Sequence, residues 1–580
     1  MKIKNLRLLG MFKLLALGLL LQCCPAELFA DQGPEEITVS GSVIDENNDP
    51  LPGVSILVKG TTRGTATDAN GKFTLTAEKG STLAFSFVGY DLHEVTVNDA
   101  SPISISLVPN ASTLNEVVVT GYSSQSKRSI TGAVSSVSGK ELTEVPQVSV
   151  DRALQGKVSG VYVSSEGVPG GNTMVRIRGF GTTNNNDPLY VIDGIPTKGN
   201  LTSLSPSDIE SITVLKDASA ASIYGSRAAN GVIVVTTKKG SAGASALNVT
   251  INRGVQSLNK SRYPDLMTPQ QLADAHRIRQ VNGTGTFAHN AYGNDPNNAV
   301  LPDFINPIGF QQGNDIVDLQ GKVIANVNQY DDNDDNDPVG GDGVYQLMRA
   351  NKEGTDWFNE TFHQANFTNV NVNYSGGSEK GTYYIGTEYF DQEGVAIHTN
   401  FKRYSARINS VGHAKDWLHI GQNLNVTYTE GVGLQNQYEN GVLAQLYRIP
   451  GIIPVYDVAG NFAGNQQVAI GDARNPVAEL TRAAENKSRI FRTFGNAFLE
   501  VDLAKGLRAK SLIGIDYTSN NSTSFTPFNP GDYQSTQTNS FTEFNSFNSA
   551  VIWTNTLSYG RDIGKHTFEA FIGTEYINNV

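Results

Sequence analysis

The feature that most constrains this chain is an alternation of apolar and polar residues that becomes systematic beyond about residue 365. Val, Leu, Ile, Phe or Tyr occupies every second position there, and Asn, Thr, Arg, Asp or Glu occupies the positions between. Successive side chains of a β-strand point to opposite faces, so the pattern predicts strands with one apolar and one polar face. The clearest segments are 369–374, 418–428, 491–502, 507–517 and 568–576.

The length of these segments favours a membrane wall over a soluble sandwich. Strands of about ten residues, apolar toward lipid and polar toward the lumen, build transmembrane barrels. The strands of soluble sandwiches average about five or six residues. We count roughly nine long strands, starting with Leu247–Val255. We expect Trp357, Trp417 and Trp553 near strand ends, as part of an interfacial aromatic girdle.

The composition agrees with such a wall. Charged residues make up 17% of the 580 residues, against about 25% in an average soluble domain, and alternate residues that face lipid explain the deficit. Acidic residues outnumber basic ones by 56 to 44, which disfavours nucleic-acid binding. A hydrophobic content of 39% argues against disorder, and a mean hydropathy of -0.26 argues against a bundle of membrane helices.

Residues 1–30 have the features of a secretory signal peptide. Four basic residues precede the short apolar run Leu14–Leu21, and Ala30 closes the segment. The apolar run is shorter than the roughly 20 residues of a transmembrane anchor, and a lipoprotein signal at Cys23 or Cys24 is the less favoured alternative. Cleavage after Ala30 would remove both cysteines, so we expect neither disulfides nor thiol chemistry in the mature protein.

Residues 31–110 predict a small β-sandwich. Short alternating strands between residues 37 and 108 are separated by turn signals such as Pro52-Gly53 and Lys79-Gly80. The segments Asp68–Phe73 and Phe85–Tyr90 resemble the carboxypeptidase-regulatory-like domain. That resemblance implies a transthyretin-like sandwich without peptidase chemistry.

Residues 111–122 contain an isolated β-branched run, Leu114–Tyr122, between polar segments. An isolated strand can add to the edge of a partner's sheet through main-chain hydrogen bonds. An inter-domain linker with some β propensity is the alternative, and the run alone does not decide between them.

Residues 123–241 predict a compact domain that mixes short helices with strands. Helices are expected at 149–156 and 217–225, which begin at a capping Ser or Asp and stop at Gly, and another is expected to start at Ser205-Pro206. Arg176 and Arg178 share one face of their strand, where we expect them to face polar groups of the barrel wall; ordinary surface arginines are the alternative. The expected strands are 175–177, 189–192, 212–215 and 232–236.

Five ordered blocks between Gly132 and Gly240 resemble the plug of a TonB-dependent outer-membrane receptor, specifically of the SusC/RagA-like branch. The blocks are Ala153–Val161, Val175–Phe180, Pro188–Pro196, Asp208–Ser219 and Tyr224–Ile233. Five blocks in order are far more specific than one short motif. By this resemblance the Ton box consists of Glu116, Val117, Val118, Val119 and Thr120. The plug motif covers Arg176, Arg178, Gly179, Asp193, Gly194, Gly225, Arg227 and Gly231.

The resemblance implies a mainly β protein that imports a large nutrient ligand, a glycan or possibly a peptide, across the outer membrane of a Gram-negative bacterium. The TonB–ExbB–ExbD complex would pull the Ton box, and a SusD/RagB-like surface lipoprotein would close over a barrel embedded in outer-membrane lipid. The sandwich would lie in the periplasm. Two rivals remain: a siderophore or cobalamin receptor, and a secreted glycan-binding β-protein of another class.

Residues 242–580 would then be the amino-terminal part of a barrel of about 22 strands. The residues after Gly240 supply fewer than half of those strands, and an open barrel would expose an unpaired strand edge to lipid. The expectation is therefore an amino-terminal fragment that ends mid-barrel at Val580.

Long loops are expected at 256–365 and 430–488, on the side where such barrels contact ligands. A helix should start at Thr268-Pro269, where Gln271 can complete a capping box. The acidic run 331–337 lacks EF-hand spacing, so a solvated loop is favoured over a calcium site. Trp357, Tyr447 and Tyr456 could stack on sugar rings, although packing or girdle positions are favoured.

Sequence motifs of common enzymes are missing. The zinc-hydrolase, P-loop, dinucleotide and nucleophile-elbow patterns do not occur, and the eight histidines are scattered. We therefore expect no catalytic residues, no metal site and no cofactor.

Overall fold

The computed structural model describes most of the chain from Glu36 onward. The residues outside the description are 1–35, 46–48, 60, 62, 88–89, 91–92, 108–116, 120–123, 127–132, 198–200, 218–220, 290, 306–309, 313–314, 318–322, 327–347, 435–440, 458–459, 465–469, 528–537, 565 and 580. The expected signal peptide and the acidic run 331–337 therefore lie outside the described residues, as do Glu116 and Thr120 of the expected Ton box. The chain divides into two compact units, 1–117 and 118–580, which are described separately.

The first unit is the predicted β-sandwich. One sheet has the strand order β4-β1-β7 and the other β3-β2-β5-β6. Alternate residues of these strands form one apolar core, in which Val39, Ile56 and Phe85 are fully buried. The strands are β1 Glu36–Ile44, β2 Ser55–Val58, β3 Gly64–Ala66, β4 Lys72–Glu78, β5 Thr82–Ser86, β6 His93–Thr96 and β7 Ile103–Ser106.

The second unit begins with the plug domain, whose centre is a five-stranded sheet of order β10-β15-β16-β13-β14. The hairpin β11-β12 and several short helices complete it. All four predicted strands are present. Their bounds and those of their neighbours are β10 Val134–Ser138, β11 Val161–Ser165, β12 Thr173–Ile177, β13 Leu189–Ile192, β14 Ile195–Thr197, β15 Ile209–Leu215 and β16 Val232–Thr237.

The plug helices are shorter than predicted, although their caps are correct. Ser149 caps α4 (Val150–Ala153), and Ser205 caps the 3-10 turn η1 (Pro206–Asp208) with Pro in the first turn. The helix expected at 217–225 lies partly outside the description, and the N–H of Ala221 donates to the carbonyl of Asp217 at 3.1 Å, as in a helical turn. The 3-10 segment η2 (Ser222–Ala228) follows, kinked where Gly225 has a φ of 65°. Another short helix, α3 (Gly139–Thr143), follows β10.

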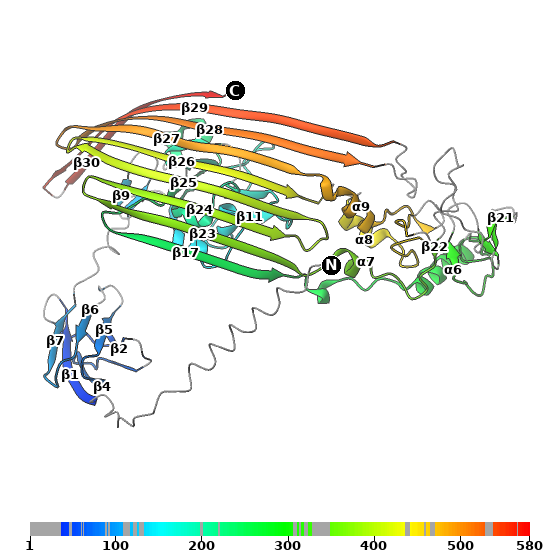
Figure 1. The fold of residues 1–580 in the computed structure, drawn as a ribbon, viewed down its shortest axis with the longest axis horizontal. Coiled ribbons are helices and arrows are strands. Elements are labelled where there is room, and N and C mark those ends of the chain that lie inside the picture. The colour runs from blue at the N-terminus through cyan, green and yellow to red at the C-terminus, as the bar shows by residue number, and fades with distance from the viewer. Residues whose placement is uncertain are drawn as a thin grey trace, which may run out of the picture. The chain divides into compact units, whose positions relative to one another are not determined.

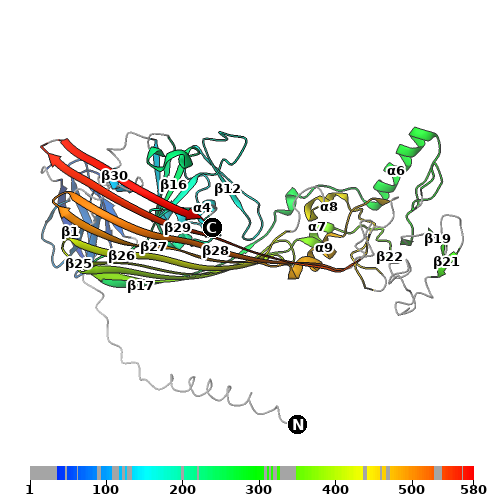
Figure 2. The same ribbon diagram turned by 90° about the horizontal axis from the view of Figure 1, so that it is seen from above.

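Nine antiparallel strands form the wall, and each strand pairs with its neighbours in the sheet order β17-β23-β24-β25-β26-β27-β28-β29-β30 (Figure 1). This confirms the predicted number of long strands. They are β17 Gly243–Gln256, β23 Ala365–Ser378, β24 Gly381–Glu393, β25 Asn400–Lys415, β26 Leu418–Val432, β27 Ser488–Ala504, β28 Leu507–Thr526, β29 Ser540–Ile563 and β30 His566–Asn579. Figure 2 shows that the sheet is curved, with the plug on its concave side.

The two faces of the wall differ as the alternation predicts. Apolar side chains of one face are exposed, among them Ile251, Ile513 and Ile572, which are between 59% and 67% accessible. The other face turns polar side chains such as Arg403 and Asn425 toward the plug, where they are buried. Such a sheet presents an apolar band to its surroundings and a polar interior. No helix of the described residues is long and apolar enough to cross a membrane.

Short turns join the wall strands at one end, and two long insertions leave it at the other. Described residues of the insertions 257–364 and 433–487 share one apolar core, and we call these described parts together the loop lobe. Its helices and turns are η3 Lys260–Arg262, α6 Pro269–Thr284, α7 Trp357–Thr361, α8 Val442–Arg448, α9 Pro476–Arg482 and η6 Ala483–Glu485. Its strands are β18 Phe304–Ile305, β19 Phe310–Gln312, β20 Asp315–Val317, β21 Val323–Asn326 and β22 Met348–Arg349.

Two predictions fall in the loop lobe. Helix α6 begins as expected, with Thr268 and Gln271 completing the capping box. A girdle position for Trp357 is wrong, because this side chain is buried in the lobe core and donates from Nε1 to the carbonyl of Pro450 at 3.4 Å. Trp417 lies in the turn between β25 and β26, and Trp553 lies within β29.

Candidate functional site

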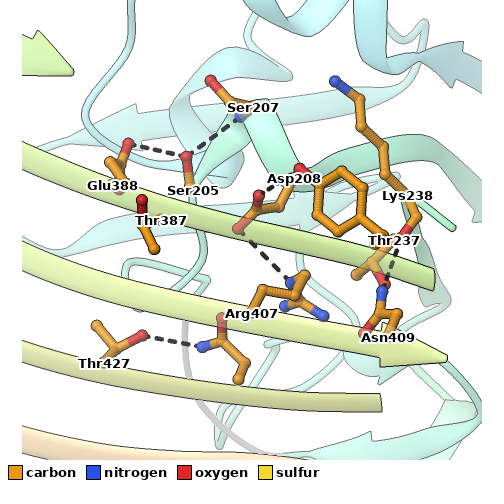
Figure 3. A network of polar contacts seen from close by, with 12 residues as sticks. Ser205, Ser207, Asp208, Thr237, Lys238, Thr387, Glu388, Arg407, Asn409 and Thr427 are labelled. Atoms are coloured by element: carbon orange, nitrogen blue, oxygen red, sulfur yellow. Dashed lines mark hydrogen bonds and ion pairs between the residues drawn. The ribbon is translucent and has the colours of Figure 1, made fainter. Parts of the chain in front are cut away.

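Many buried polar groups of the second unit lie where the plug meets the inner face of β24 to β28. Figure 3 shows the part of this contact formed by β24, β25 and β26. These wall positions are polar because every second residue of each strand points inward. Three arginines of the wall, Arg403, Arg407 and Arg492, organise the contacts.

Arg403 on β25 makes the most complete contact. Its guanidinium donates to both oxygens of Glu388, at 2.7 Å and 3.1 Å, and to the plug carbonyls of Val148 and Thr202, at 2.6 Å and 2.7 Å. Ser205 of the plug donates to the same carboxylate at 2.8 Å. This ion pair is fully buried and also hydrogen-bonded. Removing one partner would leave an unpaired buried charge and lower the free energy of unfolding by about 3–5 kcal/mol.

Arg407, two positions further along the inner face of β25, lies between two plug carboxylates. Its nitrogens are 3.6 Å from an oxygen of Asp193 and 3.6 Å from an oxygen of Asp208. Tyr384 of β24 donates to Asp208 at 2.8 Å. Burial raises the pKa of Asp208, while the nearby Arg407 and the Tyr384 hydrogen bond act in the opposite direction.

Asp193 joins two plug strands to the wall. Its carboxylate accepts from the backbone N–H of Thr237 at 3.0 Å and from the Thr237 hydroxyl at 2.7 Å. Its carbonyl accepts from the Asn496 side chain of β27 at 3.1 Å. Asn409 of β25 donates to the Thr237 hydroxyl at 2.9 Å and to the carbonyl of Lys238 at 2.7 Å. The ends of β13 and β16 are thereby fixed to three wall side chains.

Arg492 on β27 holds the plug at a third place. It forms a two-point ion pair with Asp516 at 2.9 Å and 2.8 Å, and it donates to the hydroxyls of Thr197 at 2.8 Å and Ser203 at 3.0 Å. Thr427 of β26 donates to the carbonyl of Ser203 at 2.8 Å. We call plug residues 197–205 the clamped segment, since its described part is held by all of these groups and by Arg403.

A cavity of about 1030 Å³ lies beside the clamped segment, between the plug and the inner face of the wall. Its charged side chains occur as ion pairs, Arg492 with Asp516 and Arg227 with Glu575. Most other lining groups are hydroxyls and amides, which suit hydrogen-bonding ligands. The lining includes Asn172, Leu189, Thr197, Thr202, Ser203, Phe401, Thr429, Ile490, Thr518, Asn548, Ser549 and Ile577. The clamped segment therefore belongs both to the cavity and to the contact that holds the plug.

The clamped segment is also tied to the plug interior. The carboxylate of Asp151, at the start of α4, accepts from the backbone N–H of Leu201 at 2.7 Å and from the Tyr190 hydroxyl at 2.9 Å. Burial raises the pKa of Asp151 to about 6, and the two hydrogen bonds oppose that shift. A displacement of the segment would thus break contacts in the plug core as well as contacts to the wall.

Two family models match the chain where the plug and the sandwich lie. The TonB-dependent receptor plug domain matches residues 126–232, and the CarboxypepD_reg-like domain matches residues 39–119. TonB-dependent receptor P26 of Formosa agariphila is 31% identical over 93% of this chain, and TonB-dependent receptor SusC of Bacteroides thetaiotaomicron is 33% identical over 71%. This chain is a relative of the SusC-like TonB-dependent receptors. Both relatives are named as receptors, in agreement with the lack of enzyme motifs in the sequence.

A solved structure agrees with the relationship. The RagAB peptide importer in its open-open state superposes with a TM-score of 0.61 at 28% identity, covering 80% of this chain and 49% of that one. The chain spans about half the length or less of the curated relatives it matches, 49% of receptor P26 and 35% of SusC. TonB-dependent receptors are outer-membrane β-barrel proteins, and the exposed apolar face of the wall suits that setting.

The plug motif of this chain contributes two residues to the contacts with the wall. Asp193, with a φ of 48°, contacts Arg407, and Arg227 pairs with Glu575 of β30. Arg176 pairs with Asp187, another residue of the plug, and the expectation that Arg176 faces the barrel wall stays a prediction. Arg178 is exposed, with a φ of 56°.

The motif glycines shape the plug turns. Gly179, Gly194, Gly225 and Gly231 all have positive φ values, a region that favours glycine. At Gly231 space is also limiting, because an added Cβ would lie 2.8 Å from the Ile177 side chain. Glycine at this position therefore allows β16 to begin close to the Ile177 side chain of β12.

The expected Ton box lies partly within the description. Val117–Val119 form the short strand β8, which pairs with β9 (Ser124–Ser126) in a two-stranded sheet. The role of this segment stays a prediction.

The sequence-based prediction does not single out several residues of the site: Glu388, Arg403 and Arg407 of the wall, and Asp208, which it names only as the start of a plug block. A usable signal exists in the alternation Arg403-x-Ser405-x-Arg407 on a strand, which marks two charges on one inward face. The plug partners of these charges lie about 200 residues earlier in the chain, so local pattern does not reveal them. Within the described residues, no three His, Cys, Asp or Glu side chains are grouped to hold a metal ion.

Proposed function

We propose that the whole protein imports a nutrient ligand across the outer membrane, and that the plug is held in the barrel by the wall arginines until TonB pulls it. One observation carries this proposal: the clamped segment lines the cavity and is also the part of the plug that the wall grips. A ligand in the cavity would touch Thr202 and Ser203, whose neighbouring groups bind the wall. Ligand binding in the cavity and release of the plug from the wall would then involve the same contacts.

The proposed energising partner is TonB, which would act with ExbB and ExbD and pull on Glu116–Thr120. A short β-branched strand suits this role, because strand addition uses main-chain hydrogen bonds and needs little side-chain specificity. A SusD/RagB-like lipoprotein would close the outer end of the barrel, and the amino-terminal sandwich would lie in the periplasm. Similarity to SusC and to the RagAB importer supports these assignments.

A glycan is the ligand class we favour, and a peptide is the second candidate. The charges that line the described part of the cavity are paired, and the remaining lining is rich in hydroxyls and amides, which favours an uncharged hydrogen-bonding ligand. The peptide alternative is supported by the structural similarity to RagAB, a peptide importer.

The test removes the Ton box from the full protein in its native host. Deletion of residues 116–120 should leave ligand binding by isolated outer membranes unchanged and reduce uptake to the background of a strain without TonB. Val118→Pro should act like the deletion, since proline lacks the N–H and resists strand pairing, whereas Val118→Ile should transport normally. Uptake that persists after the deletion would rule out this Ton box.

A further inference from the structure

The turn between β24 and β25, residues 394–399, is held in one conformation by its own contacts. The N–H of Gly394 donates to the carbonyl of Thr399 at 2.8 Å, and the Thr399 hydroxyl donates to the carbonyl of Ala396 at 2.7 Å. His398 has a φ of 62°, a left-handed conformation that residues other than glycine rarely adopt. A residue keeps such a conformation only where its surroundings determine it. The 394–399 turn is therefore a defined element of the structure and not a loose connection.

The first insertion of the loop lobe is joined to this turn by main-chain hydrogen bonds. The N–H of Ile397 donates to the carbonyl of Thr361, at the end of α7, at 3.0 Å. The N–H of His363 donates to the carbonyl of Val395 at 2.9 Å. Two such bonds in opposite directions form an isolated antiparallel bridge. The end of α7 and the turn are thus fixed to each other through their backbones.

The second insertion contacts the same turn through apolar side chains. Ala396 lies in a buried cluster with Val442, at the start of α8, and Leu480 of α9. Phe362 of the first insertion packs against this cluster. Close-packed side chains leave little room for independent shifts, so a displacement of one is passed to its neighbours. Both insertions of the loop lobe therefore act on the 394–399 turn.

The turn also contacts the plug, at the loop between β11 and β12 that we call plug loop 166–172. Pro169 packs directly on the backbone of Gly394, where an added Cβ would lie 2.9 Å from the proline Cγ. The next residue, Gly170, packs against the ring of Phe401 on β25, and an added Cβ there would overlap that ring. Neither contact has space for a methyl group. The turn therefore cannot move toward plug loop 166–172 without displacing it.

Plug loop 166–172 is closed by its own hydrogen bonds. The N–H of Glu166 donates to the carbonyl of Asn172, and the N–H of Asn172 donates to the Glu166 carboxylate, both at 3.2 Å. The N–H of Gly171 donates to the carbonyl of Val168 at 3.1 Å. Gly170 and Asn172 also line the cavity beside the clamped segment. A displacement of this loop would therefore change the wall of that cavity.

We propose that the 394–399 turn is a mechanical link, which transmits displacements of the loop lobe to plug loop 166–172 and so to the cavity. The turn is bonded to the lobe on one hand and in direct contact with the plug on the other, and its own conformation is fixed. Coupling between two places is reciprocal, so a displacement of the plug loop should also loosen the junction of the lobe with the turn. The inference goes beyond the proposed function, because it holds whichever ligand is imported.

Hydrogen exchange of the full protein in detergent, measured by mass spectrometry of its peptides, tests the link from the plug side. Gly170→Ala places a methyl group against the Phe401 ring and should displace the plug loop. We expect exchange to rise at least tenfold in the plug loop, in the 394–399 turn and in residues 361–363 at the lobe junction.

Gly167→Ala is the matched control. Gly167 belongs to the same loop and has a φ of 77°, close to the 62° of Gly170, so the two substitutions strain the backbone alike. An added Cβ at Gly167 would meet nothing within 4 Å. Gly167→Ala should therefore raise exchange in the plug loop alone, and circular dichroism should show that every variant is folded.

Leu480→Ala tests the link from the lobe side and remains informative if Gly170→Ala does not fold. It removes a buried side chain that packs with Ala396, and exchange should rise at least tenfold in the 394–399 turn and in plug loop 166–172. Tyr447→Ala should change neither segment, because this exposed ring of the lobe contacts Phe358 edge-on. The link is refuted if Gly170→Ala and Gly167→Ala give equal exchange outside the plug loop, or if Leu480→Ala leaves the plug loop unchanged.

Discussion

At the scale of single residues, the wall arginines differ in how completely they are satisfied. Arg403 has two carboxylate bonds and two plug carbonyls within hydrogen-bond distance, whereas Arg407 lies 3.6 Å from each of its two carboxylates. Hydrogen-bonded ion pairs are stronger than loose ones because the charges are closer and better aligned. Arg403 thus holds the plug more firmly than Arg407, which contributes mainly through charge.

Replacing Arg403 with methionine should loosen the plug. The change leaves Glu388 buried without its counter-charge, so we expect the free energy of plug unfolding to fall by about 3–5 kcal/mol. Urea titration of the detergent-solubilised protein, with protease resistance of the plug as the signal, measures this. Lys402→Met is the matched control, because Lys402 is partly exposed and lies 3.7 Å from Asp391, a type of pair worth about 0–1 kcal/mol. Equal urea midpoints for Arg403→Met and Lys402→Met would contradict the view that Arg403 holds the plug.

Residue types at the site were only partly predictable from sequence. The plug motif named Asp193, Arg227 and the glycines, since motif and backbone conformation are local properties. It could not show that Asp193 meets Arg407, because that contact depends on how the plug sits against a wall strand more than 200 residues later. The same reason explains why the pairing of Arg176 with Asp187 is not predicted, since the two residues become neighbours only when the loop after β12 folds back.

At the scale of elements, the wall strands were predictable and the loop lobe was not. Period-two alternation is visible in any window of ten residues, so the strands and their faces follow directly from sequence. The lobe depends on contacts between insertions separated by four wall strands, β23 to β26. Its core residues, such as Trp357 and Leu446, have no regular spacing, and their burial reflects tertiary packing.

Trp357→Ala should therefore unfold both insertions together. Removing this fully buried ring costs about 3–5 kcal/mol, which is comparable to the stability of a small body. Hydrogen exchange should rise in α6, α7, α8 and α9 alike and stay unchanged in β25 and β26. Trp417→Ala is the control, because Trp417 is 52% exposed in a strand turn. Increased exchange confined to α7 would show that the two insertions fold independently.

At the scale of the whole molecule, transport by the proposed mechanism requires the plug to move against the wall. Thr237 of the plug and Asn409 of the wall are joined by a hydrogen bond of 2.9 Å, so cysteines at these positions would lie within reach of a short crosslinker. The native cysteines of residues 1–580, Cys23 and Cys24, lie in the expected signal peptide, so the introduced pair should provide the thiols of residues 31–580.

Bridging Thr237→Cys to Asn409→Cys with a short reducible reagent should stop uptake while leaving ligand binding intact. Binding needs the cavity, which the bridge leaves in place, whereas transport needs separation of plug and wall at β16 and β25. Reduction of the bridge should restore transport, and each single-cysteine variant treated with the same reagent should transport throughout. If the bridged protein still imports its ligand, the plug opens without separating Thr237 from Asn409, and the release step must lie at the clamped segment instead.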